Sequence, residues 1–298
     1  MTIKNILKFI VCPYCHKKLL LRSQQLNCSS CKNIFPIIKG VPILLKKNKL
    51  NKQEIKQQEK FDYYYRQYPL TYNLEYWQQS MLKRIFNHSF KRNIKTYLDI
   101  GCGAICYTTI EAVKRNNWLS FGVDISLEAV IKAKLLARKK GLDDKTAFLV
   151  CSAEHLPFKN NIFDYISAVS VLEHLANDKK LVNDAVRVLN KKSYLYICVP
   201  NAYKNIWPFL WPFYWLGDFR MGHQRHYSLK NLNKIMEKRG CKLIKYFYNG
   251  HLIKLVQLLL EKLHLLKGKQ WWQWEKKDIN LNPKGLQLNA IYQKKQVL

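Results

Sequence analysis

From Lys95 onward the sequence alternates short apolar runs, rich in β-branched and aromatic residues, with longer segments of helical periodicity. Repeated strand–helix units of this kind predict an α/β fold with a doubly wound, mostly parallel sheet. In such sheets ligands bind at the carboxyl ends of the strands, so functional residues are expected there. The expected strands are 96–100, 119–124, 147–151, 163–171 and 194–199, and the expected helices are 108–116, 127–140 and 178–189.

Two successive strand ends carry residues typical of a nucleotide site. Gly101 and Gly103 directly follow the strand 96–100, at a point where the backbone must approach a ligand closely. Asp124 ends the next strand, 25 residues after Asp99, and an acid at this position accepts hydrogen bonds from ribose hydroxyls. A lone GxG motif is a weak signal, but glycines together with two strand-end acids predict a nucleotide-cofactor site.

Four of the nine cysteines form two CxxC pairs, Cys12 with Cys15 and Cys28 with Cys31. Two intervening residues let both thiolates of a pair reach one tetrahedral ion at about 2.3 Å. Two pairs fill all four positions, so the sequence predicts a structural Zn2+ site with no position left open to water. A small segment with a thin core needs such a cross-link. Disulfides are the alternative, and they are rare in a cytosolic chain.

The residues after the cysteines read as an apolar strand, a turn at Lys39-Gly40 and a second short strand. With the cysteines, Phe35-Pro36-Ile37 and Gly40-Val41-Pro42 resemble the zinc ribbon of the small tRNA-methyltransferase activator family, over residues 8–45. The ribbons of that family partner methyltransferases and activate them. Activation, recruitment and simple stabilisation all remain open as roles for this ribbon.

Four motifs resemble a large enzyme family: LDIGCG at 98–103, GVDIS at 122–126, AEHLPF at 153–158 and VLEHL at 171–175. Together they resemble the class I S-adenosylmethionine-dependent methyltransferases, within the group of ubiquinone/menaquinone-type enzymes, over about residues 95–248. The resemblance implies a seven-stranded Rossmann-like sheet preceded by the small zinc ribbon. It also implies methyl transfer from S-adenosyl-L-methionine.

By that resemblance, the glycines flank the amino-acid part of the cofactor and the acid of the first strand supports its amine. The acid of the second strand takes the ribose, the segment after the third strand borders the adenine, and a serine on the fourth strand lies near the sulfonium. The expected cofactor-binding residues are Asp99, Gly101, Gly103, Asp124, Ile125, Ser152, Ala153, Glu154 and Ser170.

Two positions depart from the family pattern. Ile105 stands where a third glycine is usual, and its branched side chain would crowd the loop beside the methionine moiety. Ser152 stands where an aspartate commonly takes the adenine amine, and a hydroxyl bonds less strongly than a carboxylate. A catalytically dead binding module is therefore an alternative to an active enzyme.

Three histidines are candidate catalytic bases, because imidazole accepts a proton near neutral pH. His174 lies in the VLEHL motif, where a structural role is equally plausible. His223 and His226 lie in the segment 222–228, which resembles an "H.RH(F/Y)(S/T)" segment of relatives acting on small or lipid-linked substrates. Substrate contact and local structure remain equally open for His223, Arg225 and His226. His251 is a fourth candidate.

The domain division expected from these patterns is a ribbon at 1–50, a linker with aromatic-rich helices at 51–92 and the methyltransferase domain at 93–298. The aromatic residues of 61–86 either pack against the next domain, which we favour, or form a lid over the site. Six of the eight tryptophans lie in two further segments, expected as insertions near 203–222 and 250–284. Interfacial tryptophans with lysines fit a membrane surface, whereas apolar helices more commonly cover one another and the core.

The chain carries 51 basic and 20 acidic residues, a net charge of +31, which favours polyanionic partners. Most of the basic residues are lysines, so a general compositional bias explains the charge equally well. No apolar window reaches the roughly 18 residues of a spanning helix, and residues 6–11 are too short for a secretory signal. We expect a cytoplasmic protein, with peripheral contact at an anionic membrane face as an option.

The expected acceptor is a small-molecule, lipid-linked or glycan-type compound. RNA is an alternative that we do not favour, with the basic ribbon as its recognition module, because aromatic side chains among lysines also stack bases. The sequence makes no prediction of the oligomeric state.

Overall fold

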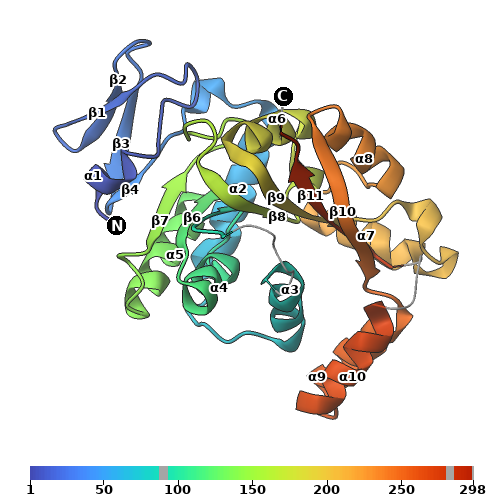
Figure 1. Ribbon diagram of the computed structural model, residues 1–298. Coiled ribbons are helices and arrows are strands. Elements are labelled where there is room, and N and C mark those ends of the chain that lie inside the picture. The colour runs from blue at the N-terminus through green and yellow to red at the C-terminus, as the bar shows by residue number, and fades with distance from the viewer. Residues whose placement is uncertain (87–92, 280–284, 297–298) are drawn as a thin grey trace.

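The computed structural model describes residues 1–86, 93–279 and 285–296, and a single sheet forms its centre (Figure 1). Its strands are β5 (Thr96–Ile100), β6 (Leu119–Asp124), β7 (Thr146–Val150), β8 (Phe163–Val169), β9 (Leu189–Pro200), β10 (Cys241–Asn249) and β11 (Gln287–Lys294). They lie in the order β10-β11-β9-β8-β5-β6-β7. The strands β5 to β9 run parallel, and β11 is antiparallel to β9 and β10. This confirms the predicted doubly wound, mostly parallel sheet of seven strands.

Helices connect the strands much as the periodicity predicts. The helices are α4 (Tyr107–Asn116), α5 (Leu127–Lys139), α6 (Asp178–Val188) and α8 (Leu229–Glu237). The Oγ of Ser126 accepts a hydrogen bond from the backbone N–H of Ala129 at 3.1 Å, which caps α5 at its predicted start. The Oγ of Ser228 caps α8 in the same way through Asn231, at 3.3 Å. Side-chain caps thus set where these helices begin.

Two strand boundaries differ from the expectation by more than one residue. β8 ends at Val169 rather than at 171, because Ser170 adopts a left-handed backbone conformation with φ of 54°. β9 begins at Leu189, directly after α6, rather than at 194. The lysines at its start conceal the apolar pattern of a strand, and one of them, Lys192, also has a positive φ of 62°.

The N-terminal segment folds as a ribbon on the edge of the main sheet. It contains α1 (Ile3–Ile6) and a four-stranded sheet of β1 (Leu19–Arg22), β2 (Gln25–Cys28), β3 (Ile34–Ile38) and β4 (Val41–Pro42). The predicted turn lies at Lys39 and Gly40, both with positive φ. The backbone N–H of Leu44 donates to the carbonyl of Val150 in β7 at 2.8 Å, so the ribbon covers an edge strand that would otherwise be exposed. One apolar cluster continues from the ribbon into the sheet. The domain boundaries stay predictions.

The aromatic-rich segment forms α2 (Lys52–Gln67) and α3 (Tyr76–Phe86), after a short 3-10 turn, η1 (Lys47–Lys49). Asn51 and Glu54 form a capping box at the start of α2, since each side chain bonds to the backbone of the other. α3 packs its buried Met81, Leu82 and Ile85 into the core, as we favoured. α2 instead lies against the loops at the carboxyl ends of the parallel strands, which is the position of the alternative, a lid.

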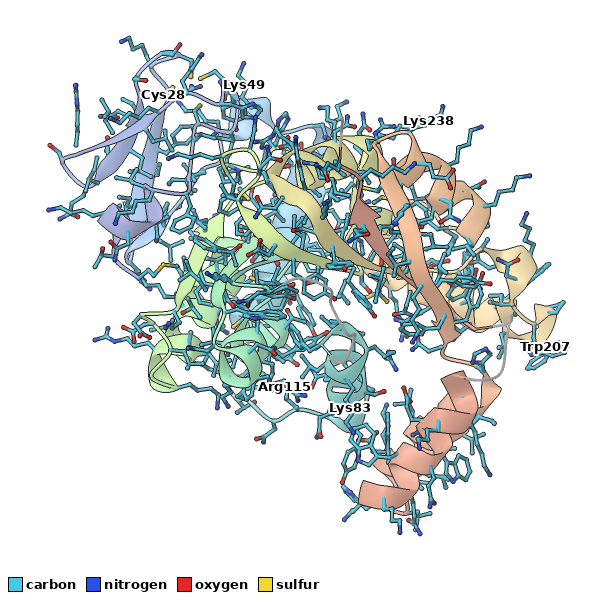
Figure 2. The ribbon with its side chains drawn as sticks, in the orientation of Figure 1. Cys28, Lys49, Lys83, Arg115, Trp207 and Lys238 are labelled. Atoms are coloured by element: carbon cyan, nitrogen blue, oxygen red, sulfur yellow. The ribbon has the colours of Figure 1, made fainter. Side chains whose placement is uncertain are left out.

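Helices occupy the two segments that were expected as insertions. After β9 the chain forms η3 (Tyr203–Asn205), η4 (Pro208–Leu210) and α7 (Trp211–Met221), and between β10 and β11 it forms α9 (Leu252–Lys262) and α10 (Gly268–Ile279). α9 and α10 pack on each other and project from the sheet beside α3 (Figure 1). Trp207 lies at the outer edge of the molecule, on the side away from the ribbon (Figure 2). The end of the second expected insertion, residues 280–284, lies outside the described residues.

The α9–α10 hairpin buries part of the surface that the sequence offered as a membrane anchor. Trp271 is fully buried, and its indole Nε1 donates to Glu261 of α9 at 2.9 Å. Trp272 lies against Tyr76 of α3 and beneath the ammonium of Lys83, which is 3.4 Å from its ring centroid. Among the described residues, none of the helices is both long and apolar enough to span a membrane.

Candidate functional site

The loop after β5 approaches its neighbours closely at two glycines. Gly101 and Gly103 both have positive φ, of 73° and 60°. A Cβ on Gly101 would lie 2.5 Å from Cγ2 of Val171, and a Cβ on Gly103 would lie 2.8 Å from the hydroxyl of Tyr65. Only glycine suits both the conformation and the space. The loop therefore has no room for a side chain at these two positions, and we call it the glycine cradle.

Ile105 does not crowd this cradle. Its side chain is half-buried and packs against the apolar cluster beneath the loop. The remaining left-handed residue of the loop is Cys106, with φ of 39°, at the start of α4. The backbone at Ile105 thus has no need of a glycine, and the departure from the family pattern leaves the loop intact.

The two strand-end acids lie in different surroundings. Asp99 is almost fully buried and accepts hydrogen bonds from three hydroxyls: those of Thr108, of Thr109 at 3.0 Å and of Ser167 at 2.9 Å. Burial raises its pKa to about 6, although the three hydroxyls oppose the shift. Asp124 accepts instead from the backbone N–H groups of Gly103 and Ser126, both at 3.0 Å. Asp124 therefore joins the glycine loop to the end of β6.

The segment after β7 turns toward α2 and α6. Ser152 donates its hydroxyl hydrogen to Glu54 of α2 and accepts the backbone N–H of Glu154 at 3.0 Å. The Glu154 carboxylate is buried and accepts the backbone N–H of Asn177 at 2.9 Å, so it faces the start of α6. Ala153, between them, is half-buried.

Four side chains of α2, which the motifs did not reveal, contact the loops that follow β5, β6 and β7. Besides Glu54, Gln58 donates to the carbonyl of Ile125 at 3.3 Å, and Asp62 accepts from Ser126 at 2.6 Å. Tyr65 lies over Gly103. The helical spacing of these side chains was visible in the sequence, but nothing in it identified their partners.

A second cluster forms where the chain leaves β8 and where α7 ends. The turn η2 (Leu172–His174) carries His174, and the segment after α7 carries His223 and His226. Asp218 of α7 lies between the last two: its carboxylate is 2.7 Å from Nδ1 of His223 and 3.0 Å from Nε2 of His226. The rings of His174 and His223 meet at a centroid distance of 4.9 Å. The structure thus brings the three predicted histidines together around an acid that the motifs did not indicate.

Burial shapes the charges of this cluster. It lowers the pKa of His174 to about 4, with the neighbouring His223 and Lys60 acting in the same direction. It also lowers the pKa of His223, although Asp218 opposes the shift. Burial raises the pKa of Glu173, next to His174, to about 8. His174 is therefore a neutral imidazole near neutral pH. The fourth candidate, His251, lies outside the cluster, 3.4 Å from Asp278 of α10.

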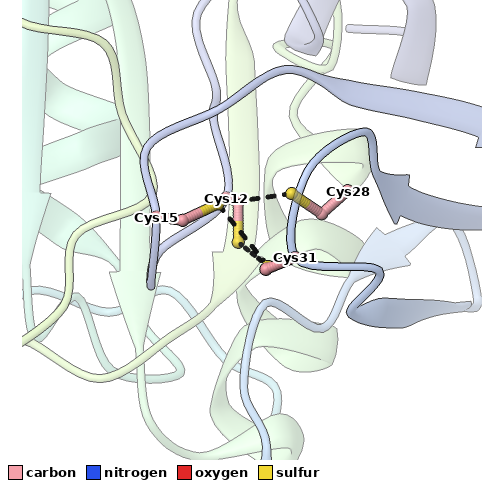
Figure 3. A group of neighbouring side chains, drawn as sticks. All are labelled: Cys12, Cys15, Cys28 and Cys31. Atoms are coloured by element: carbon pink, nitrogen blue, oxygen red, sulfur yellow. Dashed lines mark hydrogen bonds between the residues drawn. The ribbon is translucent and has the colours of Figure 1, made fainter.

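The four ribbon cysteines converge, as Figure 3 shows. All four are free thiols, and their Sγ atoms lie within 4.8 Å of one another. The separations include 3.4 Å between Cys15 and Cys28 and 3.6 Å between Cys12 and Cys31. Sulfurs about 2.3 Å from a tetrahedral ion lie a little under 4 Å apart, so the four thiols fit one zinc ion.

Residues 91–276 match the family model described as a methyltransferase domain, and residues 4–40 match that of Trm112p-like proteins. The chain belongs to the methyltransferase domain family. This membership confirms the resemblance inferred from the strand-end motifs, and the second match confirms that of the ribbon.

Two curated relatives of the family illustrate the range. Norajmaline N-methyltransferase of Rauvolfia serpentina is 31% identical over 38% of this chain and 38% of its own length. The ubiquinone/menaquinone biosynthesis C-methyltransferase of Brucella abortus is 32% identical over 37% of this chain and 40% of its own. The matched part thus spans well under half of each curated relative.

Two solved structures show the same fold. Geranyl diphosphate C-methyltransferase from Streptomyces coelicolor superposes with a TM-score of 0.61 at 14% identity, over 80% of this chain and 98% of that one. A chain from a complex that contains the Haloferax volcanii Trm112 methyltransferase activator superposes with a TM-score of 0.53 at 16% identity, over 74% and 89% of the two chains.

Within this methyltransferase domain, Arg225 has a structural position. Its guanidinium donates to the carbonyls of Leu175 and Ala176, at 2.8 and 3.1 Å. It thereby ties the histidine segment to the turn that follows β8. Ser170, which precedes this turn, is exposed at the end of β8. The loop 170–176 therefore lies between the end of β8 and the histidine cluster.

Proposed function

We propose that the protein transfers a methyl group from S-adenosyl-L-methionine to a small-molecule acceptor. The observation that carries this proposal is the glycine cradle, tied to a ribose-accepting acid and covered by α2. The cofactor supplies an activated methyl group on its sulfonium, so the protein mainly has to orient the two substrates and exclude water. Membership of the methyltransferase family and relatives named as N- and C-methyltransferases support the same reaction class.

For the cofactor we propose the residues expected from the motifs. The cradle of Gly101 and Gly103 suits the amino-acid part, since neither residue has a side chain, and Tyr65, which lies over Gly103 here, would have to move aside to admit it. Asp124 would exchange its bond to the Gly103 N–H for ribose hydroxyls, with Ile125 beside it. Asp99 holds the loop and acts on the amine. Ser152, Ala153 and Glu154 would border the adenine, and Ser170 the sulfonium.

We further propose that Glu54 provides the carboxylate that is missing at position 152. It is buried and accepts the hydroxyl hydrogen of Ser152, so its charge lies next to the expected adenine edge. A carboxylate makes a stronger hydrogen bond to an amine than a hydroxyl does. The helix α2 would then act both as a lid and as part of the adenine site.

On the acceptor side we propose that the histidine cluster receives the acceptor. His174 is neutral near pH 7, and Asp218 orients both His223 and His226. A neutral imidazole oriented by a carboxylate is suited to hold or remove a proton from an oxygen or nitrogen nucleophile. These three histidines are therefore the proposed catalytic residues.

For the ribbon we propose one structural Zn2+ on Cys12, Cys15, Cys28 and Cys31. The separations of the sulfur atoms support it, as does the hydrogen bond of 3.1 Å from the Asn33 amide to Cys31. A donor to a thiolate ligand is the kind of outer contact that orients metal sites.

A second candidate function is methylation of RNA. The Trm112p-like ribbon and the net charge of +31 favour it, because a basic surface binds phosphates. A lipid-linked acceptor at a membrane face is a third. Exposed aromatic residues of the segment after β9, among them Trp215 and Phe219, favour the lipid-linked acceptor. The burial of Trp271 argues against it.

The deciding experiment incubates the purified protein with methyl-labelled S-adenosylmethionine and a native cell extract. We expect label in the small-molecule fraction, and no label there with Asp124→Ala. The matched control is Asp143→Ala, an exposed acid after α5, which should leave the label unchanged. Label released by RNase would replace the proposal with the RNA function, and label in the organic phase would replace it with the lipid-linked acceptor. Absence of label in every fraction would contradict methyl transfer.

A further inference from the structure

The histidine cluster contains more ligand-type side chains than proton transfer requires. Two groups share His223: Glu173, His174 and His223 form one, and Asp218, His223 and His226 form the other. Within each group the candidate ligand atoms lie within 4.8 Å of one another. The two groups, from η2, α7 and the segment after α7, therefore adjoin at the ring of His223, with Asp218 at its Nδ1.

Hydrogen bonds within the cluster satisfy Asp218 but leave other buried polar atoms of the described residues without partners. Asp218 accepts hydrogen bonds from Tyr203, at 2.6 Å, and from the two histidines that flank it. Glu173 is completely buried, and neither of its carboxylate oxygens has a well-formed hydrogen bond among the described residues, although the Ser170 hydroxyl is near enough to lower the pKa of this carboxyl. Nδ1 of His174 likewise has no well-formed hydrogen bond in that part of the chain. Buried polar atoms without partners are costly and rare, so these atoms call for a ligand.

We propose that one divalent first-row transition-metal ion binds at the ring of His223, with Glu173, His174, Asp218 and His226 as the other candidate ligands. The mixture of imidazole and carboxylate suits Zn2+, Mn2+ or Fe2+ better than the oxygen-preferring Mg2+. Two histidines and one carboxylate, as in the group around Asp218, are a ligand set that leaves further positions open. Asp218 offsets part of the charge of the ion even with the Lys60 ammonium close by, and Glu173 adds a second negative charge once it releases its proton on binding.

The site is accessible from one side. The side chains of Asp218, His223 and His226 keep 12%, 15% and 17% of their surface exposed, whereas Glu173 is enclosed. Phe61 of α2 packs edge-on against His174, at a centroid distance of 5.7 Å, and closes the side toward the cofactor loops. An ion here would occupy imidazole nitrogens that are otherwise free to accept a proton, and it would itself lower the pKa of an acceptor oxygen or nitrogen that it holds next to the loop 170–176. That role rests on the proposed methyl transfer, whereas the ion site itself does not.

The test is a titration of the full-length protein, with its ribbon ion in place, with Co2+ alone. Cobalt bound by nitrogen and oxygen gives visible absorption without the near-ultraviolet thiolate band of a cysteine site, so the two sites are distinguishable. We expect one equivalent to bind at the nitrogen- and oxygen-ligated site. His223→Asn with His226→Asn should weaken this binding at least tenfold, and Glu173→Gln should weaken it on its own.

The matched control is His251→Asn, which removes a buried histidine beside Asp278, outside the cluster. It should leave the cobalt spectrum and affinity unchanged. Circular dichroism shows whether each variant is folded, and Glu173→Gln keeps the shape of the side chain if the double variant does not fold. Absence of the visible band in the wild type would overturn the proposal, as would an unchanged affinity in Glu173→Gln.

Methyl transfer is measured separately on the same protein. Label transfer without cobalt binding would overturn the ion site and leave the proposed function standing. Cobalt binding without label transfer would support the ion site and contradict the proposed function.

Discussion

At the scale of single residues, Asp99 shows how burial and hydrogen bonding compete. Its carboxylate is enclosed by the sheet and by the first turn of α4, and three hydroxyls donate to it. These donors favour the charged form, but the loss of solvent outweighs them and leaves the pKa at about 6. Asp99 therefore joins the end of β5 to α4 and β8 through hydrogen bonds, while its charge depends on pH.

The raised pKa makes a prediction about stability. The folded state holds a proton on Asp99 up to about pH 6, whereas the unfolded chain releases it near 3.8, so the folded state binds more protons between these values. The contribution of Asp99 to stability is thus fully present below about pH 4 and is lost as the pH rises through 6. About two pKa units correspond to roughly 3 kcal/mol.

The measurement is urea unfolding of the wild type and of Asp99→Asn at several pH values. We expect the wild type to lose stability relative to the variant by up to about 3 kcal/mol between pH 4 and pH 7. The variant cancels all other titrations, which both proteins share. A difference that stays constant, or that grows in favour of the wild type, would show that Asp99 is ionised throughout.

At the scale of elements, the loop after β5 and the helix α2 form the site as a pair. The loop has no side chain at Gly101 and Gly103, and Tyr65 of α2 lies over Gly103. The polar groups of α2 then bond to the ends of β6 and β7. Access to the proposed cofactor site would consequently need a shift of α2 or of Tyr65.

Substitution of the first loop glycine tests the cradle. Gly101→Ala introduces a side chain into a left-handed backbone and places its Cβ 2.5 Å from Val171. Gly141→Ala is a matched control, because its φ is 67° and a Cβ there meets no atom within 4 Å. We expect the control to lose about 1 kcal/mol of stability from backbone strain alone, and Gly101→Ala to lose roughly 1–3 kcal/mol more, by urea unfolding. Equal losses would mean that Val171 yields without cost.

The charge on α2 gives a second prediction at this scale. Glu54→Gln keeps the cap of the helix but removes the carboxylate, so we expect S-adenosylhomocysteine to bind about 5- to 10-fold more weakly by calorimetry. Glu59→Gln, on the exposed face of the same helix, should bind as the wild type does. Equal affinities of the two variants would remove Glu54 from the adenine site.

At the scale of the whole molecule, the ribbon and the sheet share one hydrophobic core. The ribbon contributes Ile10, Leu26 and Phe35 to the same apolar cluster as Phe121 and Phe158 of the methyltransferase domain. Backbone hydrogen bonds from the segments around Val11 and Leu44 join the ribbon to the edge of the sheet. A ribbon attached in this way cannot unfold without exposing the core beside it.

Loss of the ribbon ion should therefore lower the stability of the entire chain. Cys31→Ser removes an exposed thiol and sacrifices little packing, so its effect reports the metal. We expect a single calorimetric transition whose Tm falls by at least about 5 °C, because each kcal/mol shifts a large domain by roughly 2–4 °C. Ser30→Ala, in the same knuckle, should have no effect. A separate ribbon transition, with the main one unmoved, would contradict the shared core.

The sequence predicts the elements and motifs that depend on neighbouring residues, but not the contacts between segments far apart in the chain. Periodicity, caps and turn glycines predict the strands, the helices and the ribbon, because these depend on residues a few positions apart. The spacing of the cysteines and of the strand-end motifs likewise predicts which residues meet.

The tertiary structure alone decided the rest. It placed α2 over the cofactor loops, Glu54 against Ser152, and Asp218 with Glu173 among the histidines. Each of these contacts joins segments distant along the chain, and only packing into one core sets such distances. The same packing buried Trp271, which the sequence had offered as a membrane anchor.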